Sequence, residues 1–294
     1  MDSSKRESIA NTFFVAIVVC LVCSTIVSTA HYLLEPLQKA NKALDIKKNI
    51  VAAIGLDENQ IEAAGGINGL FEGDSPRIST QIIDLRTGEE SLEKVQEIYQ
   101  HESPEQTLAE YDQFTAAKDT ERGDELNVRL EGSADLAKIK SREHYSPVYI
   151  FKDEQGNPDK YVFPIRGLGL WSTLKGFIAL ESDFQTVVGL TYYEHGETPG
   201  LGGEVDNSKW KANWIGKKVF GDDGLVALRV VKGVAADEFG VDGLSGATIT
   251  SNGVTNMLEF WLGESGFGPY IAKVKAANGT STGGSNEGEG GSGG

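Results

Sequence analysis

The chain has 294 residues, and its 43 acidic and 27 basic side chains give it a formal net charge of −16 at pH 7. This balance argues against a nucleic-acid partner, because binding to phosphates requires a basic face. Hydrophobic residues make up 39% of the chain, which is enough to build a folded core. Two cysteines, Cys20 and Cys23, are too few for a four-cysteine metal centre, an iron–sulfur centre or a disulfide-rich scaffold.

The first predicted element is an apolar helix near the N-terminus. Residues 13 to 34 include no Asp, Glu, Lys or Arg. A helix of this length measures roughly 33 Å, enough to cross a bilayer core. The alternative is a cleaved signal peptide, with Ser28-Thr29-Ala30 as its small-residue cleavage site. The segment is longer than a typical signal core of about 7–15 residues, which favours a transmembrane helix over 13–34, preceded by a cytoplasmic segment over 1–12.

The charges that flank this helix leave its orientation open. Lys5 and Arg6 precede it, whereas Lys39, Lys42, Lys47 and Lys48 follow it. The larger positive group would place the following domain in the cytoplasm, but long domains cross membranes largely regardless of nearby charge. The cysteine pair lies inside the helix and is interpreted as small packing residues.

The region over 35–146 is predicted to be helical and acidic. A helix over 37–54 is expected to continue the apolar helix out of the membrane. The segment over 78–85 is predicted as a strand, and no chemistry is assigned to the region. Further short helices are predicted over 93–99, 107–118 and 134–139.

From residue 147 the pattern changes to strands. Strands over 148–152 and 161–165 flank a turn-forming cluster and are predicted to pair as a hairpin. A helix over 254–262 has a one-sided apolar stripe, with Thr250, Ser251 and Asn252 as N-cap candidates and Gly263 as its end. Further strands are predicted over 177–180, 187–192 and 226–231.

The predicted fold class is therefore α+β: an N-terminal transmembrane helix, then a domain with a mainly antiparallel sheet and packed helices over 147–278. Residues 279–294 are rich in Gly and are predicted to form a disordered tail.

One motif leads directly into the last of these helices. Asp242-Gly-Leu-Ser-Gly-Ala-Thr248 includes four consecutive small residues, Ser245 to Thr248, which allow a bulky group to approach the backbone. Free N–H groups and the positive end of the dipole at a helix N-terminus favour a phosphate there. The alternative is an ordinary capped loop before a helix.

Two more glycine-rich segments carry polar or aromatic side chains. In the segment Tyr192 to Gly203, His195 and Glu197 lie close together, which suggests acid–base work, although a surface histidine is the commoner case. The second is Gly167-Leu-Gly-Leu-Trp171-Ser. Neither segment has the glycine spacing of a dinucleotide-binding fold.

These residues carry a resemblance to a known family. The motif Asp242 to Thr248 resembles the covalent flavinylation motif of FMN-binding domains. Together with the run Gly189 to Glu204 and with Gly169-Leu-Trp-Ser172, it is similar to the C subunits of the sodium-pumping NADH:quinone reductase. The longer runs favour this family over the G subunits of the related Rnf electron-transport complex.

The resemblance implies covalent FMN, joined through its phosphate to the hydroxyl of Thr248 rather than that of Thr250. Because a threonine hydroxyl is a poor nucleophile by itself, a separate flavin transferase that uses FAD is expected to attach it. The resemblance implies no catalytic residue and no metal ligand in this chain. The residues implied around the cofactor are Trp171, Glu197, Thr198, Leu201, Gly202, Lys232, Asp242, Ser245, Gly246, Ala247 and Thr250.

The resemblance also implies a redox role without an NADH site of this chain's own. The chain would relay electrons through FMN inside a six-subunit membrane complex that couples NADH oxidation by ubiquinone to sodium export, with the other five subunits as partners. In the family the flavin transferase acts outside the cytoplasm, which implies a single-pass protein of the bacterial inner membrane with its FMN domain in the periplasm. The alternatives are the G subunit of an Rnf complex, with a ferredoxin donor, and a membrane-anchored binding protein without redox function.

Overall fold

The computed structural model describes residues 9–72 and 75–281, and it divides into two compact units, residues 1–46 and 47–294. Helix α1 (Ile9–Ile54) includes Pro36 and continues from one unit into the other. The predicted helices over 13–34 and 37–54 are therefore one helix. Among the described residues, α1 is the one helix that is long and apolar enough to cross a membrane. Its most apolar stretch is not buried against other parts of the protein. The predicted cytoplasmic segment over 1–12 lies mostly outside the described residues.

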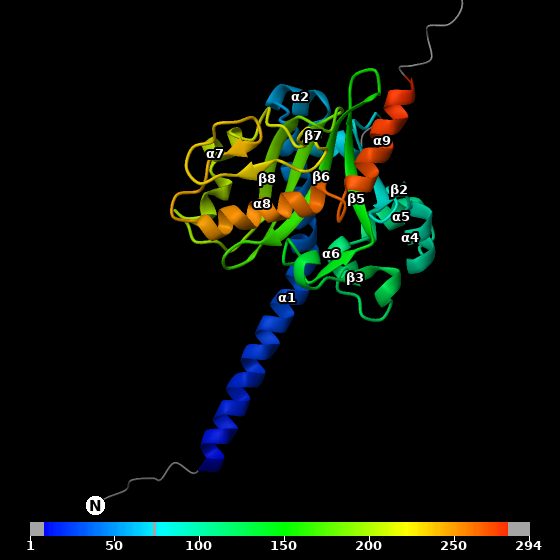
Figure 1. Ribbon diagram of the computed structural model, residues 1–294. Coiled ribbons are helices and arrows are strands. Elements are labelled where there is room, and N and C mark those ends of the chain that lie inside the picture. Colours follow the sequence, from blue (N-terminus) through cyan, green and yellow to red (C-terminus); the bar gives the residue numbers. More distant parts are fainter. Residues whose placement is uncertain (1–8, 73–74, 282–294) are drawn as a thin grey trace, which may run out of the picture. The chain divides into compact units, whose positions relative to one another are not determined.

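The second unit is built on one six-stranded sheet with the order β2-β1-β5-β6-β7-β8, and every neighbouring pair is antiparallel (Figure 1). The predicted hairpin is confirmed, and its strands are longer than expected. The predicted strands over 78–85, 177–180 and 187–192 are confirmed as β1, β7 and β8. The strand bounds are β1 Ile78–Asp84, β2 Glu89–Glu90, β5 Tyr145–Lys152, β6 Pro158–Leu168, β7 Thr173–Glu181 and β8 Val187–Glu194.

Helices cover both faces of this sheet. Alternate strand residues point to opposite faces, so Leu190 and Tyr192 of β8 join the core formed with α8 (Thr248–Leu262) and α9 (Gly268–Ser281). On the other face, the hydroxyl of Thr191 donates a hydrogen bond to the carbonyl of Asn49 in α1 at 3.1 Å. Figure 1 shows α8 crossing the sheet.

Region 57–145 contributes strands β1 and β2 to the same sheet that the predicted FMN domain forms. Strand β1 pairs with β5 along its whole length, from Ile78 with Phe151 to Asp84 with Tyr145. The boundary predicted between residues 146 and 147 is therefore not a boundary in the structure. The remaining elements of the region are α2 (Glu58–Ala63), α3 (Gly66–Glu72), α4 (Leu92–Tyr99), α5 (Pro104–Glu110), α6 (Gln113–Ala116), β3 (Asn127–Arg129) and β4 (Ser141–Glu143), with 3-10 turns at Gly123–Glu125 and Gly132–Ala134.

Two predicted helices of this region differ from the structure. The helix over 107–118 is two helices, α5 and α6, because Asp112 leaves the helical conformation and its carboxylate caps α6 through the amide of Thr115. The prediction of a helix over 134–139 is wrong. The carboxylate of Asp135 accepts the amides of Ile139 and Lys140 instead, and this closes the segment into a loop.

Three further differences lie closer to the C-terminus. The strand over 226–231 shortens to β9 (Arg229–Val230), which pairs with β10 (Gly240–Val241) in parallel. Helix α8 begins at Thr248, so Thr250, Ser251 and Asn252 lie in its first turns and do not cap it, whereas Gly263 is its C-cap as predicted. Helix α9 was not predicted and extends three residues into the predicted tail, and the rest of the tail lies outside the described residues. Shorter elements are the 3-10 turn Gly202–Asp206 and α7 (Ser208–Ala212).

A close approach between α8 and the last residue of β6 fixes the position of α8. A Cβ atom added at Gly253 would lie 2.3 Å from the carbonyl oxygen of Leu168, a backbone atom that cannot move aside alone. On the same helix, Trp261 donates from its ring nitrogen to the carbonyl of Arg166 at 2.7 Å. The guanidinium of Arg166 forms a buried ion pair with Glu143. These contacts join α8 to β6 and β6 to β4.

We expect Gly253→Ala to lower the free energy of unfolding by about 1–3 kcal/mol, because the new methyl group would overpack this contact. Glu259→Ala is the matched control, since Glu259 is an exposed residue of α8 and its loss should change stability by no more than about 0.5 kcal/mol. Urea unfolding of the full chain in detergent measures both. Equal stability of the two variants would contradict the close contact.

Candidate functional site

Glu197, three residues after the end of β8, organises the site. Its side chain is only 5% exposed. Its carboxylate accepts hydrogen bonds from the backbone amides of Leu170, Trp171 and Ser172 at 2.9–3.2 Å. The hydroxyl of Thr250, in the first turn of α8, donates to the same carboxylate at 2.7 Å. Glu197 therefore joins three chain segments that are far apart in the sequence.

Two glycines make room for this carboxylate. A Cβ atom at Gly169 would lie 2.6 Å from one carboxylate oxygen of Glu197. A Cβ atom at Gly202 would lie 2.6 Å both from the other oxygen and from the hydroxyl of Thr250. The glycines of the two sequence motifs are thus explained by their approach to one buried side chain.

The environment of Glu197 keeps it ionised. Burial by itself would raise its pKa, but the hydrogen bonds from the Thr250 hydroxyl and the three amides outweigh burial and hold the pKa below its ordinary value of 4.5. When folding lowers the pKa of a carboxyl group, its ionised form stabilises the folded protein at pH values above the ordinary pKa. This stabilisation is lost as the pH falls through the pKa of the folded state.

We therefore expect the difference in unfolding free energy between the wild type and Glu197→Gln to be largest at neutral pH and to shrink as pH falls below 4.5. Urea unfolding of both proteins over that pH range measures this difference. A difference that stays constant with pH would mean that the charge of Glu197 adds nothing to stability.

The segment from Asp242 to Thr248 forms a loop with a defined shape. The carboxylate of Asp242 accepts the amide of Ala235 at 2.8 Å, and its carbonyl accepts the ring N–H of Trp210 at 2.8 Å. The amide of Gly243 donates to the carbonyl of Gly233. Asp242 therefore positions this loop beside residues 233–235. Gly246 has a φ of +71°, which a residue without Cβ adopts at no steric cost.

The loop ends at an open helix N-terminus. Thr248 is the first residue of α8 and is exposed, and the N-cap residue Ala247 provides no side-chain hydrogen bond within the described part of the chain. The first amides of a helix without such a cap remain available to an anion. A cavity of about 480 Å³ opens in front of them and is lined by residues that include Thr248, Ser245, Gly246, Asp242 and Lys232.

Three apolar side chains of α8 and of the segments over 170–172 and 197–202 are exposed. Trp171 is 70% exposed, Ile249 is 57% exposed and Leu201 is 44% exposed. Leu201 lies against the loop, since a Cβ atom at Gly246 would come 2.9 Å from its side chain. Trp171 is therefore not a core residue, and its neighbours offer apolar surface that water covers poorly.

These features fit FMN. The open N-terminus of α8, the hydroxyl of Thr248 and the ammonium group of Lys232 suit the phosphate, and exposed apolar side chains suit the flat ring. Of the predicted residues, Lys232, Asp242, Ser245, Gly246 and Thr248 line one cavity. Ala247 is the N-cap residue of α8, and Glu197, Gly202 and Thr250 form the buried support behind it.

Two predicted residues have other partners. Thr198 contributes its carbonyl, which accepts the amides of Leu201 and Gly203 and closes the turn that presents Leu201. His195 bonds the carboxylate of Asp206 at 2.7 Å, and its other ring nitrogen accepts the backbone amide of Glu197. No acid–base pair forms between the side chains of His195 and Glu197 in the described structure.

Sequence reasoning missed some residues of this site. Ile249 and Asn252 lie in the first turns of α8, and Asn252 lines the cavity with Thr248, four residues before it. The i,i+4 spacing of Asn252 from Thr248 would have indicated it if the helix had been predicted to begin at Thr248, whereas Ile249, at i+1, does not share that face. Val231, Gly233 and Val234 also line the cavity. Val231 is the last residue of the strand predicted over 226–231, and Gly233 and Val234 come from the loop after it, which no sequence pattern marked.

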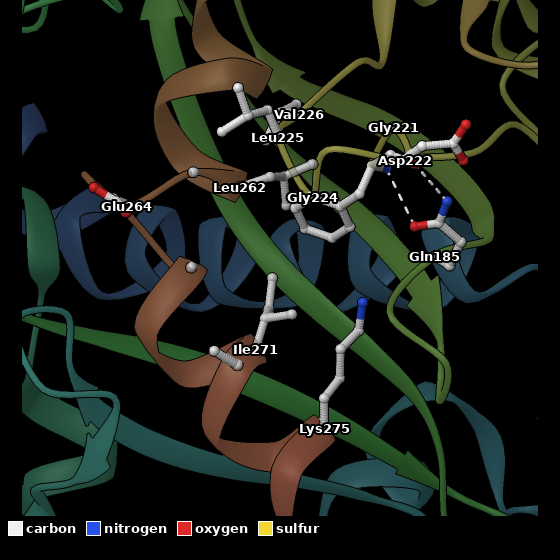
Figure 2. A pocket seen from close by; sticks show the side chains of 14 residues that line it. Gln185, Gly221, Asp222, Gly224, Leu225, Val226, Leu262, Glu264, Ile271 and Lys275 are labelled. Carbon is white, nitrogen blue, oxygen red and sulfur yellow. Dashed lines mark hydrogen bonds between the residues drawn. The ribbon is translucent and has the colours of Figure 1, made fainter. Parts of the chain in front are cut away.

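A second cavity, of about 560 Å³, lies where α8 ends and α9 begins (Figure 2). Leu262 and Ile271 line it, and Lys275 lies 4.7 Å from the centre of the Phe220 ring. Gln185 holds the backbone of Phe220 with two hydrogen bonds. Burial lowers the pKa of Lys275. None of the predicted flavin residues lines this cavity, so its size alone does not make it the site.

Comparison with known proteins supports FMN as the cofactor of this domain. The model of the FMN-binding domain matches residues 169–263. The C subunit of the Na(+)-translocating NADH-quinone reductase of Vibrio alginolyticus is 43% identical over 275 residues, covering 93% of this chain and 98% of that protein. The corresponding protein of Yersinia pestis is 40% identical over 272 residues, covering 92% and 94%.

Solved structures agree with the sequence comparisons. The crystal structure of NqrC from Shewanella oneidensis superposes with a TM-score of 0.68 at 33% identity, over 81% of this chain and 99% of that one. The C subunit of the reductase from Parabacteroides distasonis superposes with a TM-score of 0.56 at 28% identity, over 81% of this chain and 96% of that one. The predicted resemblance is confirmed, and the chain belongs to the family of the C subunits of the Na(+)-translocating NADH-quinone reductase.

Proposed function

We propose that the chain is the electron-relay subunit of a Na+-translocating NADH:quinone reductase and carries FMN esterified to Thr248. The observation that carries the proposal is the cavity at the uncapped N-terminus of α8, where the exposed Thr248 lies with Lys232 and the small-residue loop. When bound, FMN supplies reversible electron transfer, and the protein sets its position and potential.

The residues of this chain have separate tasks at that site. The open amides of α8 and the ammonium group of Lys232 bind the phosphate. Leu201 and Trp171 cover the ring and exclude water from it. The carboxylate of Glu197 positions the loop over 170–172 and the first turn of α8 relative to each other.

The position of Thr250 supports Thr248 as the attachment residue. Thr250 is fully buried and its hydroxyl is already committed to Glu197, whereas Thr248 is exposed. A transferase can reach a hydroxyl only if its side chain is accessible. We propose that a separate FAD-dependent flavin transferase recognises Asp242 to Thr248. A threonine hydroxyl is a poor nucleophile by itself, and the described residues include no cluster that could hold a metal ion to activate it.

We propose further that α1 anchors the chain uncleaved in the bacterial inner membrane, with the FMN domain in the periplasm. The length and hydropathy of α1 support the anchor, and the need for a transferase outside the cytoplasm supports the orientation. Protease added to intact spheroplasts should digest the second unit. Digestion only after lysis would place that unit in the cytoplasm.

The relay function is tested in membranes from a strain that lacks this chain but retains the other subunits. Wild-type chain should restore NADH-driven quinone reduction and sodium uptake, and the Thr248→Val chain should restore neither. Restoration of both by Thr248→Val, at equal assembly, would exclude an essential relay through this residue. Full activity without any form of the chain would exclude the relay role altogether.

A further inference from the structure

A third cavity differs in charge from the rest of this acidic chain. It has a volume of about 400 Å³. Among the described residues that line it, five are cationic and none is acidic, although the chain as a whole has 43 acidic and 27 basic residues. Its cationic residues are Lys118, Lys138, Lys140, Arg166 and Lys175.

Within residues 9–72 and 75–281, two of these five charges are paired with a carboxylate. Arg166 pairs with Glu143, and Lys175 pairs with Glu194 at 2.6 Å. Lys118, Lys138 and Lys140 have no carboxylate within 4 Å in the part of the chain that the structure describes. Three uncompensated positive charges around one cavity repel one another and attract an anion.

The backbone holds two of these lysines in an unfavourable conformation. Lys138 has a φ of 54° and Lys140 has a φ of 67°, values that cost energy for a residue with a Cβ atom. The carboxylate of Asp135 maintains this loop by accepting the amides of Ile139 and Lys140. The loop therefore fixes the backbone from which both lysines reach the cavity.

The cavity also shares a loop with the flavin site. Leu168 and Thr173, at the two ends of the loop over 168–173, line the cavity. The amides in the middle of the same loop hold Glu197. The amide of Leu168 donates to the carbonyl of Ala137, which lies in the loop over 135–140 that carries Lys138 and Lys140. A ligand in the cavity would therefore contact the loop that positions Glu197.

We propose that this cavity binds a phosphate-bearing organic anion. A single carboxylate would compensate only one of the three free lysines, whereas a phosphate group can carry two negative charges and accept several hydrogen bonds. The hydroxyls of Ser141 and Thr173 also line the cavity, and Phe114, Ile139 and Leu168 provide an apolar surface for the organic part. The volume lies in the range of small-ligand sites. A free organophosphate and a phospholipid headgroup share this chemistry.

The test uses the full chain in nanodiscs and measures the acetylation of each lysine by peptide mass spectrometry. Pyrophosphate and glycerol 3-phosphate are the soluble probes, and phosphatidylglycerol in place of phosphatidylcholine is the lipid probe. We expect Lys118, Lys138 and Lys140 to be protected, while Lys209 and Lys211 of α7 react as before. Protection by the soluble probes identifies a free organophosphate, and protection by phosphatidylglycerol alone identifies a lipid headgroup.

A pair of variants separates this cavity from general charge effects. Lys138→Asn with Lys140→Asn removes two charges and keeps a residue that tolerates positive φ. Lys209→Gln with Lys211→Gln removes the same charge elsewhere. The first pair should weaken binding of the probe about tenfold, as expected for lost charge-assisted hydrogen bonds, and the second pair should not. The proposal would be overturned if the two double variants bound the probe with equal affinity, or if the probe protected all lysines alike. Protection of these lysines only in the assembled complex would also overturn the proposal, because it would assign the cavity to a protein partner.

Discussion

Thr248→Val is expected to remove covalent FMN completely while the chain still folds and inserts into the membrane. Valine keeps the branched shape of threonine and lacks only the hydroxyl to which the phosphate would be esterified. Thr248 is exposed, so the substitution leaves no buried donor unpaired. The measurement is flavin fluorescence of the denatured chain after electrophoresis, with total chain measured by staining.

Thr248→Ser is the matched variant, because it retains a hydroxyl at the same backbone position. It should retain covalent flavin, at a yield set by how well the transferase accepts serine. Fluorescence of the denatured Thr248→Val chain equal to that of the wild type would contradict the attachment at Thr248. Loss of fluorescence in Thr250→Val alone would move the attachment to Thr250, in conflict with the burial of that hydroxyl.

Glu197→Gln is expected to lower the free energy of unfolding by about 2–3 kcal/mol, the range for removing hydrogen bonds to a buried charged group. A glutamine whose Oε1 keeps the three backbone amides would place its N–H donors where Oε2 now accepts from the Thr250 hydroxyl, and those amides would bond a neutral oxygen in place of a charged one. Thr250→Val removes one donor and should cost about 1–2 kcal/mol, since it leaves the carboxylate partly satisfied. Urea unfolding of the full chain in detergent measures both.

Because Glu197 and Thr250 share a hydrogen bond of 2.7 Å, the double variant should lose less stability than the sum of the two single losses. Glu194→Gln is the matched control. It makes the same substitution at an exposed carboxylate paired with Lys175, where the loss should be no more than about 1 kcal/mol. Additive losses in the double variant, or equal losses in Glu197→Gln and Glu194→Gln, would refute the organising role of Glu197.

The sheet could be predicted because its signals are local. Turn residues after Lys152 and apolar strand residues on both sides mark the β5–β6 hairpin within about twenty residues of sequence. The loop over 135–140 could not be predicted in the same way. Its residues are compatible with a helix, and the competing hydrogen bonds of the Asp135 carboxylate decide the outcome.

The chemistry of the flavin site could be predicted from its motif, but its support could not. The small residues and hydroxyls of 245–248 are adjacent in the sequence, so their role follows from the motif itself. The partners of Glu197 lie 25 to 53 residues away, and no pattern in the sequence joins them. The start of α8 was missed for the same reason. Thr250 looks like an N-cap residue, but its hydroxyl is used by Glu197 from another segment.

Covalent attachment of FMN at Thr248 is tested most directly by peptide mapping of the wild-type chain, isolated from membranes that also contain the flavin transferase. The denatured chain is digested and fragmented in a mass spectrometer, which locates any modification to one residue. We expect a single adduct on Thr248, with the mass of FMN less one water. An unmodified peptide over Asp242 to Thr250 in membranes with active transferase, or an adduct on any other residue, would contradict it.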